Sequence, residues 1–233
     1  MRQKILGLIP ARAGSQGVPG KHTKLLGSKS LIHYTFQSAI QSRLLDTVAL
    51  STDSDEIIND AKSFPDIEIP FVRPANLATE ETPTVLVIQH ALNFYQNIGK
   101  HFDYVCLLQA TTPFRKDGLI DKAVSYFLNT NAESLTTVRI VPSKYNPHWC
   151  FEFTENAQLK PVMQESRLIP RRQDLPDAYY RDGQIYIVSR KLVQNGLLLN
   201  EQTIGLINSD GPDINIDTMD DWNLAKKWLS NEK

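Results

Sequence analysis

The chain is poor in the residues that build disulfide scaffolds, zinc sites and membrane spans. Its 233 residues include only two cysteines, Cys106 and Cys150, which are too few for a disulfide framework or a cysteine-based metal site. The formal net charge of −1 provides no cationic excess for nucleic acid, and no apolar run approaches the roughly 18 residues of a membrane span. We therefore expect a cytoplasmic protein with two core cysteines and with neither a nucleic-acid nor a membrane partner.

A glycine-rich loop follows the first predicted strand. Residues 5–9 read ILGLI, which has the length of a buried strand, and Pro10 ends it because proline cannot donate the next ladder hydrogen bond. Arg12 and Lys21 place positive charge at either end of the loop. Three glycines between them leave backbone N–H groups uncovered, so that these groups can point together at an anion: Gly14, Gly17 and Gly20. The loop is therefore suited to bind a polyphosphate.

Two common phosphate-binding patterns do not match this loop. A Walker loop has four residues between its first glycine and Gly-Lys-Ser/Thr, whereas Gly14 and Gly20 enclose five and His22 follows the lysine. The dinucleotide pattern Gly-x-Gly-x-x-Gly opens directly into a helix, whereas the spacing here is Gly-x-x-Gly-x-x-Gly and Pro19 lies inside it. On the residues alone, a surface loop with solvated cations remains an equal alternative.

Apolar periodicity predicts alternating strands and helices along the chain. A helix is expected over residues 31–42, capped by Ser30. Strands are expected at residues 5–9, 47–50, 69–72, 104–108 and 135–139. This alternation is typical of an α/β fold, here a mostly parallel doubly wound (Rossmann-like) sheet with helices on both faces. In such sheets, ligands bind outside the carboxyl ends of the strands.

Oxygen-bearing side chains alternate near the C-terminus. In residues 213–217, which read DINID, alternation places Asp213, Asn215 and Asp217 on one face of an extended segment. Such a face can hold a hard cation such as Mg²⁺. Thr218 can then cap the last helix, and an alternative role for Asp217 is to assist that cap.

The glycine-rich loop resembles the opening signature of the acylneuraminate cytidylyltransferases, the CMP-sialic acid synthetase family. Residues 9–21 read IPARAGSQGVPGK, close to the family's I-P-A-R-x-G-S-K-x-x-x-x-K-N, and further matches follow along nearly the whole chain. Gln16 and His22 replace the usual lysine and asparagine. The resemblance implies that these residues of the loop bind the nucleotide: Ala11, Arg12, Gly14, Ser15, Lys21 and His22.

Later segments extend the resemblance to the rest of the site. Residues 73–78 (RPANLA) match R-P-x-x-L-A, which implies nucleotide contacts for Arg73 and for Thr84 beyond it. Residues 107–115 (LLQATTPFR) resemble L-L-Q-P-T-S-P-L-R, and residues 182–187 (DGQIYI) resemble N-G-x-I-Y-I. These matches imply acceptor-sugar contacts for Gln109, Thr111 and Tyr186.

The family's metal-binding segment, D-I-D-T-x-x-D, matches residues 215–221 with one change. Asp217 retains the second aspartate, whereas Asn215 replaces the first. The resemblance implies that both contact Mg²⁺, with Asp217 as the main ligand.

A segment of different character interrupts the alternating pattern. Residues 141–182 combine short β-like runs with the basic, proline-bounded stretch 169–176, and we interpret them as an insertion. Residues 1–140 and 183–233 then form the nucleotidyltransferase core. In the resembled family this region makes a dimer contact and carries an arginine toward the partner's active site, which Arg172 matches. We therefore expect a homodimer. Trp149, Phe151 and Phe153 would give the insertion an apolar face.

Together, these patterns predict a CTP-dependent cytidylyltransferase that acts on a nine-carbon keto-sugar acid. Arg12, Lys21 and Asp217 are the expected catalytic residues, Mg²⁺ is the expected cofactor, and no side chain is an obvious general base. Two alternatives remain open at this point. The acceptor could instead be an eight-carbon ulosonic acid, or the protein could be a catalytically weak nucleotide-binding regulator, because His22 and Asn215 depart from the family pattern.

Overall fold

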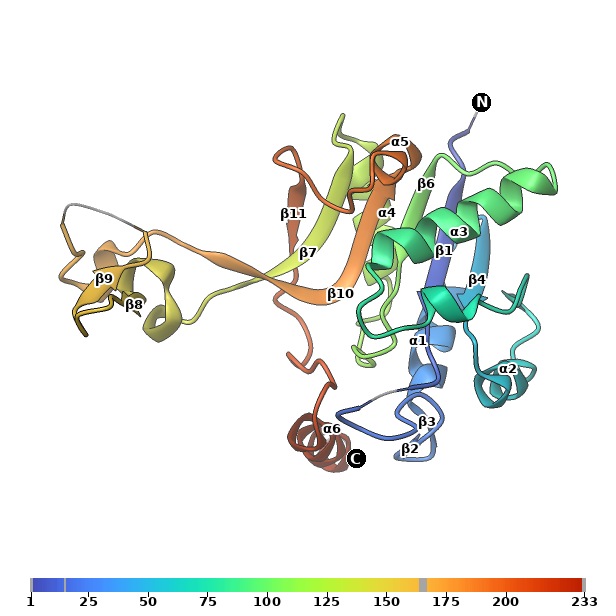
Figure 1. Cartoon of the computed structure of the whole chain (residues 1–233), viewed down its shortest axis with the longest axis horizontal. Coiled ribbons are helices and arrows are strands. Elements are labelled where there is room, and N and C mark those ends of the chain that lie inside the picture. Colours follow the sequence, from blue (N-terminus) through green and yellow to red (C-terminus); the bar gives the residue numbers. More distant parts are fainter. Residues whose placement is uncertain (1, 15, 164–166, 232–233) are drawn as a thin grey trace.

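A seven-stranded sheet organises the described part of the chain, residues 2–14, 16–163 and 167–231 of the computed structural model (Figure 1). The strand order is β11 (Ile204–Ile207), β7 (Ser134–Ile140), β10 (Tyr179–Ser189), β6 (Tyr104–Leu107), β1 (Ile5–Pro10), β4 (Thr47–Ser51) and β5 (Ile67–Glu68). Strand β10 runs antiparallel to both of its neighbours, and the other strands share one direction. The predicted mostly parallel sheet is therefore confirmed.

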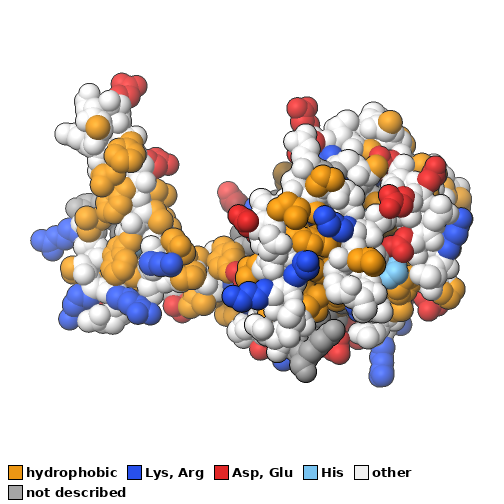
Figure 2. All heavy atoms as spheres, turned by 90° about the horizontal axis from the view of Figure 1, so that it is seen from below, with side chains coloured by type: hydrophobic (Ala, Val, Ile, Leu, Met, Phe, Trp, Pro, Cys, Tyr) orange, Lys and Arg blue, Asp and Glu red, His pale blue; other side chains and the backbone are white. Residues whose placement is uncertain are grey.

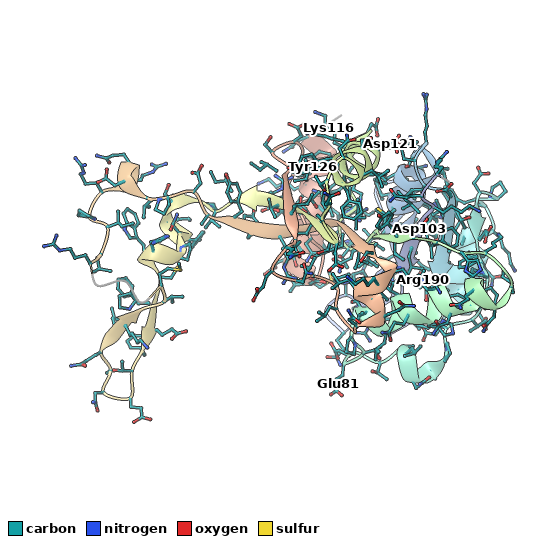
Figure 3. All side chains as sticks on the ribbon, turned by 90° about the horizontal axis from the view of Figure 1, so that it is seen from above. Glu81, Asp103, Lys116, Asp121, Tyr126 and Arg190 are labelled. Atoms are coloured by element: carbon teal, nitrogen blue, oxygen red, sulfur yellow. The ribbon has the colours of Figure 1, made fainter. Side chains whose placement is uncertain are left out.

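An arm extends from one side of this sheet. Strands β7 and β10 continue past the core as a two-stranded ribbon, in which Ile140 pairs with Tyr179 and the N–H of Val141 donates to the carbonyl of Ala178 at 2.8 Å. Figures 2 and 3 show the ribbon separating the arm from the core. Beyond the ribbon lie β8 (Phe151–Phe153), β9 (Leu159–Pro161) and the short 3-10 helices η2 (Ser143–Tyr145), η3 (Pro147–Trp149) and η4 (Arg172–Asp174). The division at residues 141 and 182 stays a prediction.

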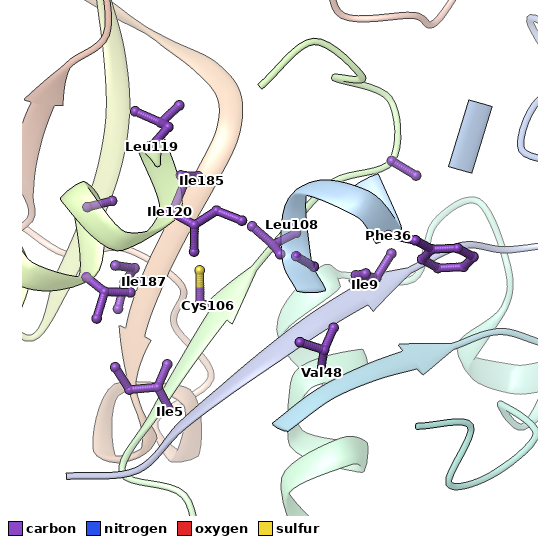
Figure 4. Close-up of a cluster of buried hydrophobic side chains, with 14 of the residues drawn as sticks. Ile5, Ile9, Phe36, Val48, Cys106, Leu108, Leu119, Ile120, Ile185 and Ile187 are labelled. Carbon is purple, nitrogen blue, oxygen red and sulfur yellow. The ribbon is translucent and has the colours of Figure 1, made fainter. Parts of the chain in front are cut away.

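Helices cover both faces of the sheet because alternate side chains of each strand point to opposite sides. On one face, Ile5 and Ile9 pack with α1 (Leu31–Ile40), α2 (Asp55–Ala61) and α4 (Leu119–Leu128) (Figure 4). On the other face, Leu6 and Leu8 pack with α3 (Thr84–Asn97) and α5 (Arg190–Gln194). The doubly wound arrangement places the first loop and the loops after β4 and β6 at one edge.

A third apolar cluster joins the two ends of the chain. Helix α6 (Met219–Asn231) packs Trp222 against Val18 of the first loop, Leu26 of the hairpin β2 (Leu25–Leu26) and β3 (Lys29–Ser30), and Ile216. The C-terminal segment is therefore fixed beside the glycine-rich loop. None of the helices in the described ranges has the length and hydropathy required to cross a membrane.

Three local expectations were wrong. The strand expected at residues 69–72 lies at β5 instead, and Val72 makes only a single bridge to Thr52, because Pro70 has no N–H to donate. Ser30 precedes α1 without capping it, and its hydroxyl donates to Asp60 at 2.6 Å. Cys106 is buried as expected, but Cys150 is partly exposed in the arm.

Candidate active site

A cavity of about 530 Å³ opens at the carboxyl ends of β1 and β6. Parallel strands of an α/β sheet place their ligand sites at this edge, and the volume suits a small organic substrate. Nine of the residues predicted for the site line it: Arg12, Lys21, His22, Arg73, Thr84, Gln109, Thr111, Asn215 and Asp217. The structure therefore brings together residues that are distant in the sequence.

Lys21 joins the glycine-rich loop to the C-terminal segment. Its side chain is buried, and its ammonium group donates to the backbone carbonyl of Ile216 at 2.8 Å and to Oδ1 of Asp217 at 3.1 Å. The side chain of Asp217 is 61% exposed and lines the cavity, whereas the side chain of Lys21 that contacts it is buried. Lys21 is thus held at the cavity by two oxygen atoms, one of them anionic.

Gly17 allows this close approach. A Cβ atom added at Gly17 would lie 1.9 Å from the backbone carbonyl oxygen of Asp217, a distance that no side chain can tolerate. The loop therefore needs glycine at this position for packing against residues 216–217, independently of any phosphate. Gly14 differs, because its added Cβ would meet only Nη1 of Arg12, at 3.5 Å.

Arg73 adds a buried cation to the cavity wall. Its Nε donates to the hydroxyl of Ser51 at 3.0 Å, its Nη2 donates to the Ser51 carbonyl, and its backbone N–H donates to Thr52 at 2.7 Å. Burial lowers the pKa of Arg73 to about 10, opposed by the nearby Asp53 carboxylate, so the guanidinium stays charged at neutral pH. Among the described residues, Nη1 of Arg73 has no hydrogen-bond acceptor and is available to an anion.

His22 is neutral at this site. Burial, reinforced by the positive charge of Lys21, lowers its pKa to about 4. Its Nδ1 lies 3.2 Å from the carbonyl oxygen of Arg12, which can only accept, so Nδ1 carries the proton and Nε2 is an acceptor. His22 therefore contributes a hydrogen-bonding group rather than positive charge.

The oxygen-bearing segment alternates as predicted. Ile214 and Ile216 are buried, while Asp213, Asn215 and Asp217 are exposed. Asn215 donates from Nδ2 to Oδ2 of Asp217 at 2.7 Å. Only two of the three polar residues line the cavity, however. Asp213 instead lies 3.7 Å from Nε of Arg139 and accepts a hydrogen bond from the hydroxyl of Tyr180.

The cap of α6 leaves the Asp217 side chain free for the cavity. The hydroxyl of Thr218 accepts from the N–H of Asp221 at 3.2 Å, and the Asp221 carboxylate accepts from the N–H of Thr218 at 2.8 Å. This reciprocal pair forms a capping box, in which the carboxylate of Asp217 takes no part. The capping alternative for Asp217 is therefore not supported.

The residues present can accommodate a divalent cation together with a substrate. Asp217 supplies one carboxylate and Asn215 one amide oxygen, and Mg²⁺ commonly takes one or two carboxylates and completes its shell with water and phosphate oxygens. Within the described ranges, no group of three or more His, Cys, Asp or Glu side chains forms an all-protein metal site. The donors here therefore fit a metal that is held jointly with a phosphate.

The loop after β6 forms another part of the cavity wall. Gln109 and Thr111 line this wall, and the carbonyl of Thr111 accepts from the N–H of Ile216 at 2.8 Å. That hydrogen bond connects the predicted sugar-side loop directly to the predicted metal-side segment. Lys21, Ile216 and Thr111 thus form a continuous link around the cavity.

Four of the predicted site residues that the structure describes do not line the cavity. Ala11 is buried, with its N–H donating to Ser51 at 2.9 Å, and Gly14 lies exposed on the loop. Tyr186 is packed in the core cluster with α3. Arg172 lies on the arm, where its Nε donates to the hydroxyl of Ser143 at 3.1 Å. Ser15 lies outside the described residues.

One part of the cavity wall, the segment between Arg73 and α3, is absent from the site predicted by the sequence. Glu80 lies there, 3.7 Å from Nη2 of Arg12, and places an anion beside a predicted catalytic cation. Leu77, Thr79 and Thr82 also line the cavity. The polar run Thr79–Thr82 after the RPANLA motif was the available signal, but only the fold reveals that it turns toward Arg12.

The cavity thus combines three cations with two exposed carboxylates, Asp217 and Glu80, at the edge where the segments after β1, β5 and β6 meet. Residues 6–197 match the cytidylyltransferase family model. The chain belongs to the cytidylyltransferase family. It is therefore a CTP-dependent nucleotidyltransferase, and enzymes of this type generally use a divalent metal ion.

Relatives extend over nearly the whole chain. The cytidylyltransferase is 35% identical to the CMP-N,N'-diacetyllegionaminic acid synthase of Legionella pneumophila over 97% of this chain and 96% of that protein. It is 30% identical to a pseudaminic acid cytidylyltransferase of Campylobacter jejuni over 96% and 95%. A CMP:2-keto-3-deoxy-manno-octonic acid synthetase complexed with CTP has the same fold, with a TM-score of 0.71 at 16% identity over 99% of this chain and all of the other. The relatives confirm the resemblance inferred from the motifs.

We predict that Gly17→Ala destabilises the protein and weakens CTP binding. The new methyl group would meet a backbone carbonyl rather than a flexible side chain, so the loop and the Asp217 segment must separate. We expect a loss of about 1 to 3 kcal/mol in the free energy of unfolding, measured by urea denaturation. We also expect a higher dissociation constant for CTP, measured by calorimetry. Gly14→Ala is the matched control, since its methyl group makes only an ordinary contact. Equal behaviour of the two variants would contradict the assignment.

We also predict that His22 makes the protein sensitive to acid. Its pKa is about 4 in the folded protein against 6.5 for an unperturbed histidine, so the unfolded chain binds the proton first as the pH falls. Stability from this site is full above pH 6.5 and declines below it. When the pH falls from 7 to 5, the free energy of unfolding of the wild type should decrease by about 2 kcal/mol more than that of His22→Asn. Parallel curves for the two proteins would show that His22 is not held neutral by the fold.

Proposed function

We propose that this cytidylyltransferase transfers CMP from CTP to the anomeric hydroxyl of a nine-carbon 2-keto sugar acid, a nonulosonic acid, in the cytoplasm. The names of its full-length relatives, which act on legionaminic and pseudaminic acids, support this substrate class. The observation that carries the proposal is the cavity itself, where Arg12, Lys21 and Arg73 meet the Asn215–Asp217 segment at the strand ends.

The reaction replaces a phosphoanhydride bond of CTP by a phosphate ester bond to the sugar. The anomeric oxygen attacks the α-phosphorus of CTP, the bond from that phosphorus to the bridging oxygen breaks, and pyrophosphate leaves with the electron pair. The hydroxyl proton passes to solvent. Arg12, Lys21 and Arg73 neutralise the phosphate charge, and catalysis rests on positioning and electrostatic stabilisation rather than on a dedicated base. His22, with its pKa of about 4, is too weakly basic to act as one.

Lys21 has to change partners when CTP binds. In the free protein its ammonium contacts the Ile216 carbonyl and Asp217, and the triphosphate would compete with Asp217 for it. The exposed position of Asp217 suits this exchange, since its carboxylate can turn into the cavity without being buried. Binding of nucleotide would thus release the Asp217 carboxylate at the moment when a metal ion accompanies the triphosphate.

We propose Mg²⁺ as the metal, with Asp217 as the main protein ligand and Asn215 as a neutral second ligand. When bound, the ion supplies positive charge to the phosphates of the nucleotide. Asn215 also orients Asp217 through its 2.7 Å hydrogen bond, so it acts on the carboxylate whether or not it touches the ion.

We predict opposite effects for two substitutions at this pair. Asp217→Asn should reduce kcat on the order of 10² to 10³-fold, the scale of losing a preorganised transition-state partner. Asn215→Asp should lower the Mg²⁺ concentration for half-maximal rate, because it adds negative charge beside the ion. Asp213→Asn is the matched control, because Asp213 alternates with these residues but does not line the cavity. Unchanged Mg²⁺ dependence in both test variants would place the metal elsewhere.

We further propose a homodimer in which the arm contacts a second subunit. Figure 2 shows hydrophobic side chains over much of the arm, and Phe151 and Phe153 are 40% and 79% exposed. Leu159, Val162 and Leu168 are exposed as well. Apolar surface of this kind is expected to be covered by a partner. By the family resemblance, Arg172 of one subunit would then serve the cavity of the other.

A mixing experiment tests whether Arg172 acts across the dimer. Arg172→Ala and Lys21→Ala should each have low activity alone. After subunit exchange, hybrid dimers carry one cavity with both residues intact, so part of the activity should return. Recovery measured by pyrophosphate release supports sharing between subunits. Proven exchange without recovery would show that Arg172 does not serve the other subunit's site.

The reaction itself is tested by pyrophosphate release from CTP and Mg²⁺ with a panel of keto-sugar acids. We expect turnover with nine-carbon acids such as legionaminic, pseudaminic or neuraminic acid derivatives and much less with an eight-carbon acid. Preference for the eight-carbon acid would correct the acceptor. CTP binding without release from any acid would instead indicate a nucleotide-binding regulator.

A further inference from the structure

Arg115 is a fully engaged cation that does not line the cavity. Its side chain is buried and projects from the loop after β6 into the space between that loop, α1 and β10. No ion pair joins it to a carboxylate within the described part of the chain. The Asp182 carboxylate favours the charge of Arg115 from beyond ion-pair distance, but a buried guanidinium without a carboxylate in contact needs further compensation.

Backbone carbonyl and hydroxyl oxygens around Arg115 compensate for the burial of its charge. The five N–H donors of a guanidinium match five hydrogen bonds here. Nε donates to the Gln184 carbonyl at 2.9 Å, and Nη1 donates to the Thr35 hydroxyl at 3.0 Å and to the Thr112 carbonyl at 2.9 Å. Nη2 donates to the Thr112 hydroxyl at 2.8 Å and to the Gln109 carbonyl. Burial lowers the pKa of Arg115 to about 10, so it remains charged at neutral pH.

These hydrogen bonds fix the loop after β6, residues 108–115, to two other elements. Two of the acceptor residues, Gln109 and Thr112, belong to the loop, whereas Thr35 lies on α1 and Gln184 on β10. The loop is also fitted to the bend of β10 at Gly183, whose φ is +74° and whose added Cβ would lie 3.3 Å from Oε1 of Gln109. Arg115 therefore holds the backbone carbonyl of Gln109, and the side-chain oxygen of Gln109 lies close to Gly183.

We propose that Arg115 is a positioning residue for the acceptor sugar acid, which acts by holding Gln109 and Thr111 in the cavity wall. This inference rests on the proposed function, because it assigns that wall to the sugar acid. It predicts that loosening the loop affects the sugar acid more than CTP. Lysine cannot substitute for this arginine, since a compact ammonium has three donors and cannot reach five acceptors in one plane.

Steady-state kinetics of Arg115→Lys, with each substrate varied in turn, provide the main test. We expect KM for the sugar acid to rise by about tenfold or more, while KM for CTP stays within about twofold, because a displacement of about 1 Å in a positioning group can cost that much. Thr112→Val removes one acceptor and should shift KM in the same direction by a smaller factor, even if Arg115→Lys folds poorly.

Two controls separate positioning from general loss of stability. Leu192→Ala creates a cavity on α5, on the opposite face of the sheet, and Arg190→Lys changes a partly exposed arginine at the start of that helix (Figure 3). Neither should alter the ratio of the two KM values. The proposal is overturned if Arg115→Lys leaves KM for the sugar acid unchanged, raises both KM values equally, or behaves like Leu192→Ala.

Hydrogen exchange in the free protein gives a readout that needs no substrate. Arg115→Lys should accelerate exchange in the peptide that contains residues 109–112, while Leu192→Ala should not. If the wild-type enzyme turned over no sugar acid, the proposed function would fail, and this measurement would still decide whether Arg115 orders the loop. Unchanged exchange in residues 109–112 would overturn the positioning role.

Discussion

The hydrogen bonds of the Lys21 ammonium to Ile216 and Asp217 are the interaction on which the site depends. They join residues 195 and 196 positions apart, and they close the cavity between the first loop and the last strand-like segment. Removing one partner of a fully buried ion pair destabilises a protein by about 3 to 5 kcal/mol. The loss for the Lys21–Asp217 pair would be smaller, because the Asp217 carboxylate is exposed to solvent. The absence of a side chain at Gly17 and the packing of Val18 with Trp222 make this approach possible.

The same contact explains how one loop can serve both folding and chemistry. In the free protein the lysine stabilises the C-terminal segment, and in the proposed complex it would stabilise phosphate charge. Glu80 beside Arg12 suggests an equivalent exchange at the other end of the loop, since both cations have an exposed anionic partner that a triphosphate can displace. A site with such internal partners avoids three uncompensated positive charges around an empty cavity.

Sequence patterns predicted the parts of the site that depend on local order. The β1 strand, the alternation of residues 213–217 and the Thr218 cap follow from periodicity and capping preferences, which act over a few residues. The meeting of site residues that are far apart in the sequence was predicted only from the family resemblance. The predictions that were wrong or missing depend on tertiary contacts. The Ser30 hydroxyl binds Asp60 instead of capping α1, and Asp213 contacts Tyr180 and Arg139 instead of lining the cavity. The five hydrogen-bond acceptors of Arg115 come from three different elements.

The central claim is that Lys21 leaves Asp217 to bind the triphosphate. Calorimetric titration of CTP into the wild type and into Lys21→Met, which keeps the apolar stem but lacks the ammonium, measures this directly. The account predicts that the CTP dissociation constant of the folded variant rises by roughly ten- to a hundredfold, the scale of one lost charge-assisted contact of about 1.5 to 3 kcal/mol. An unchanged dissociation constant, with the fold verified by circular dichroism, would contradict it.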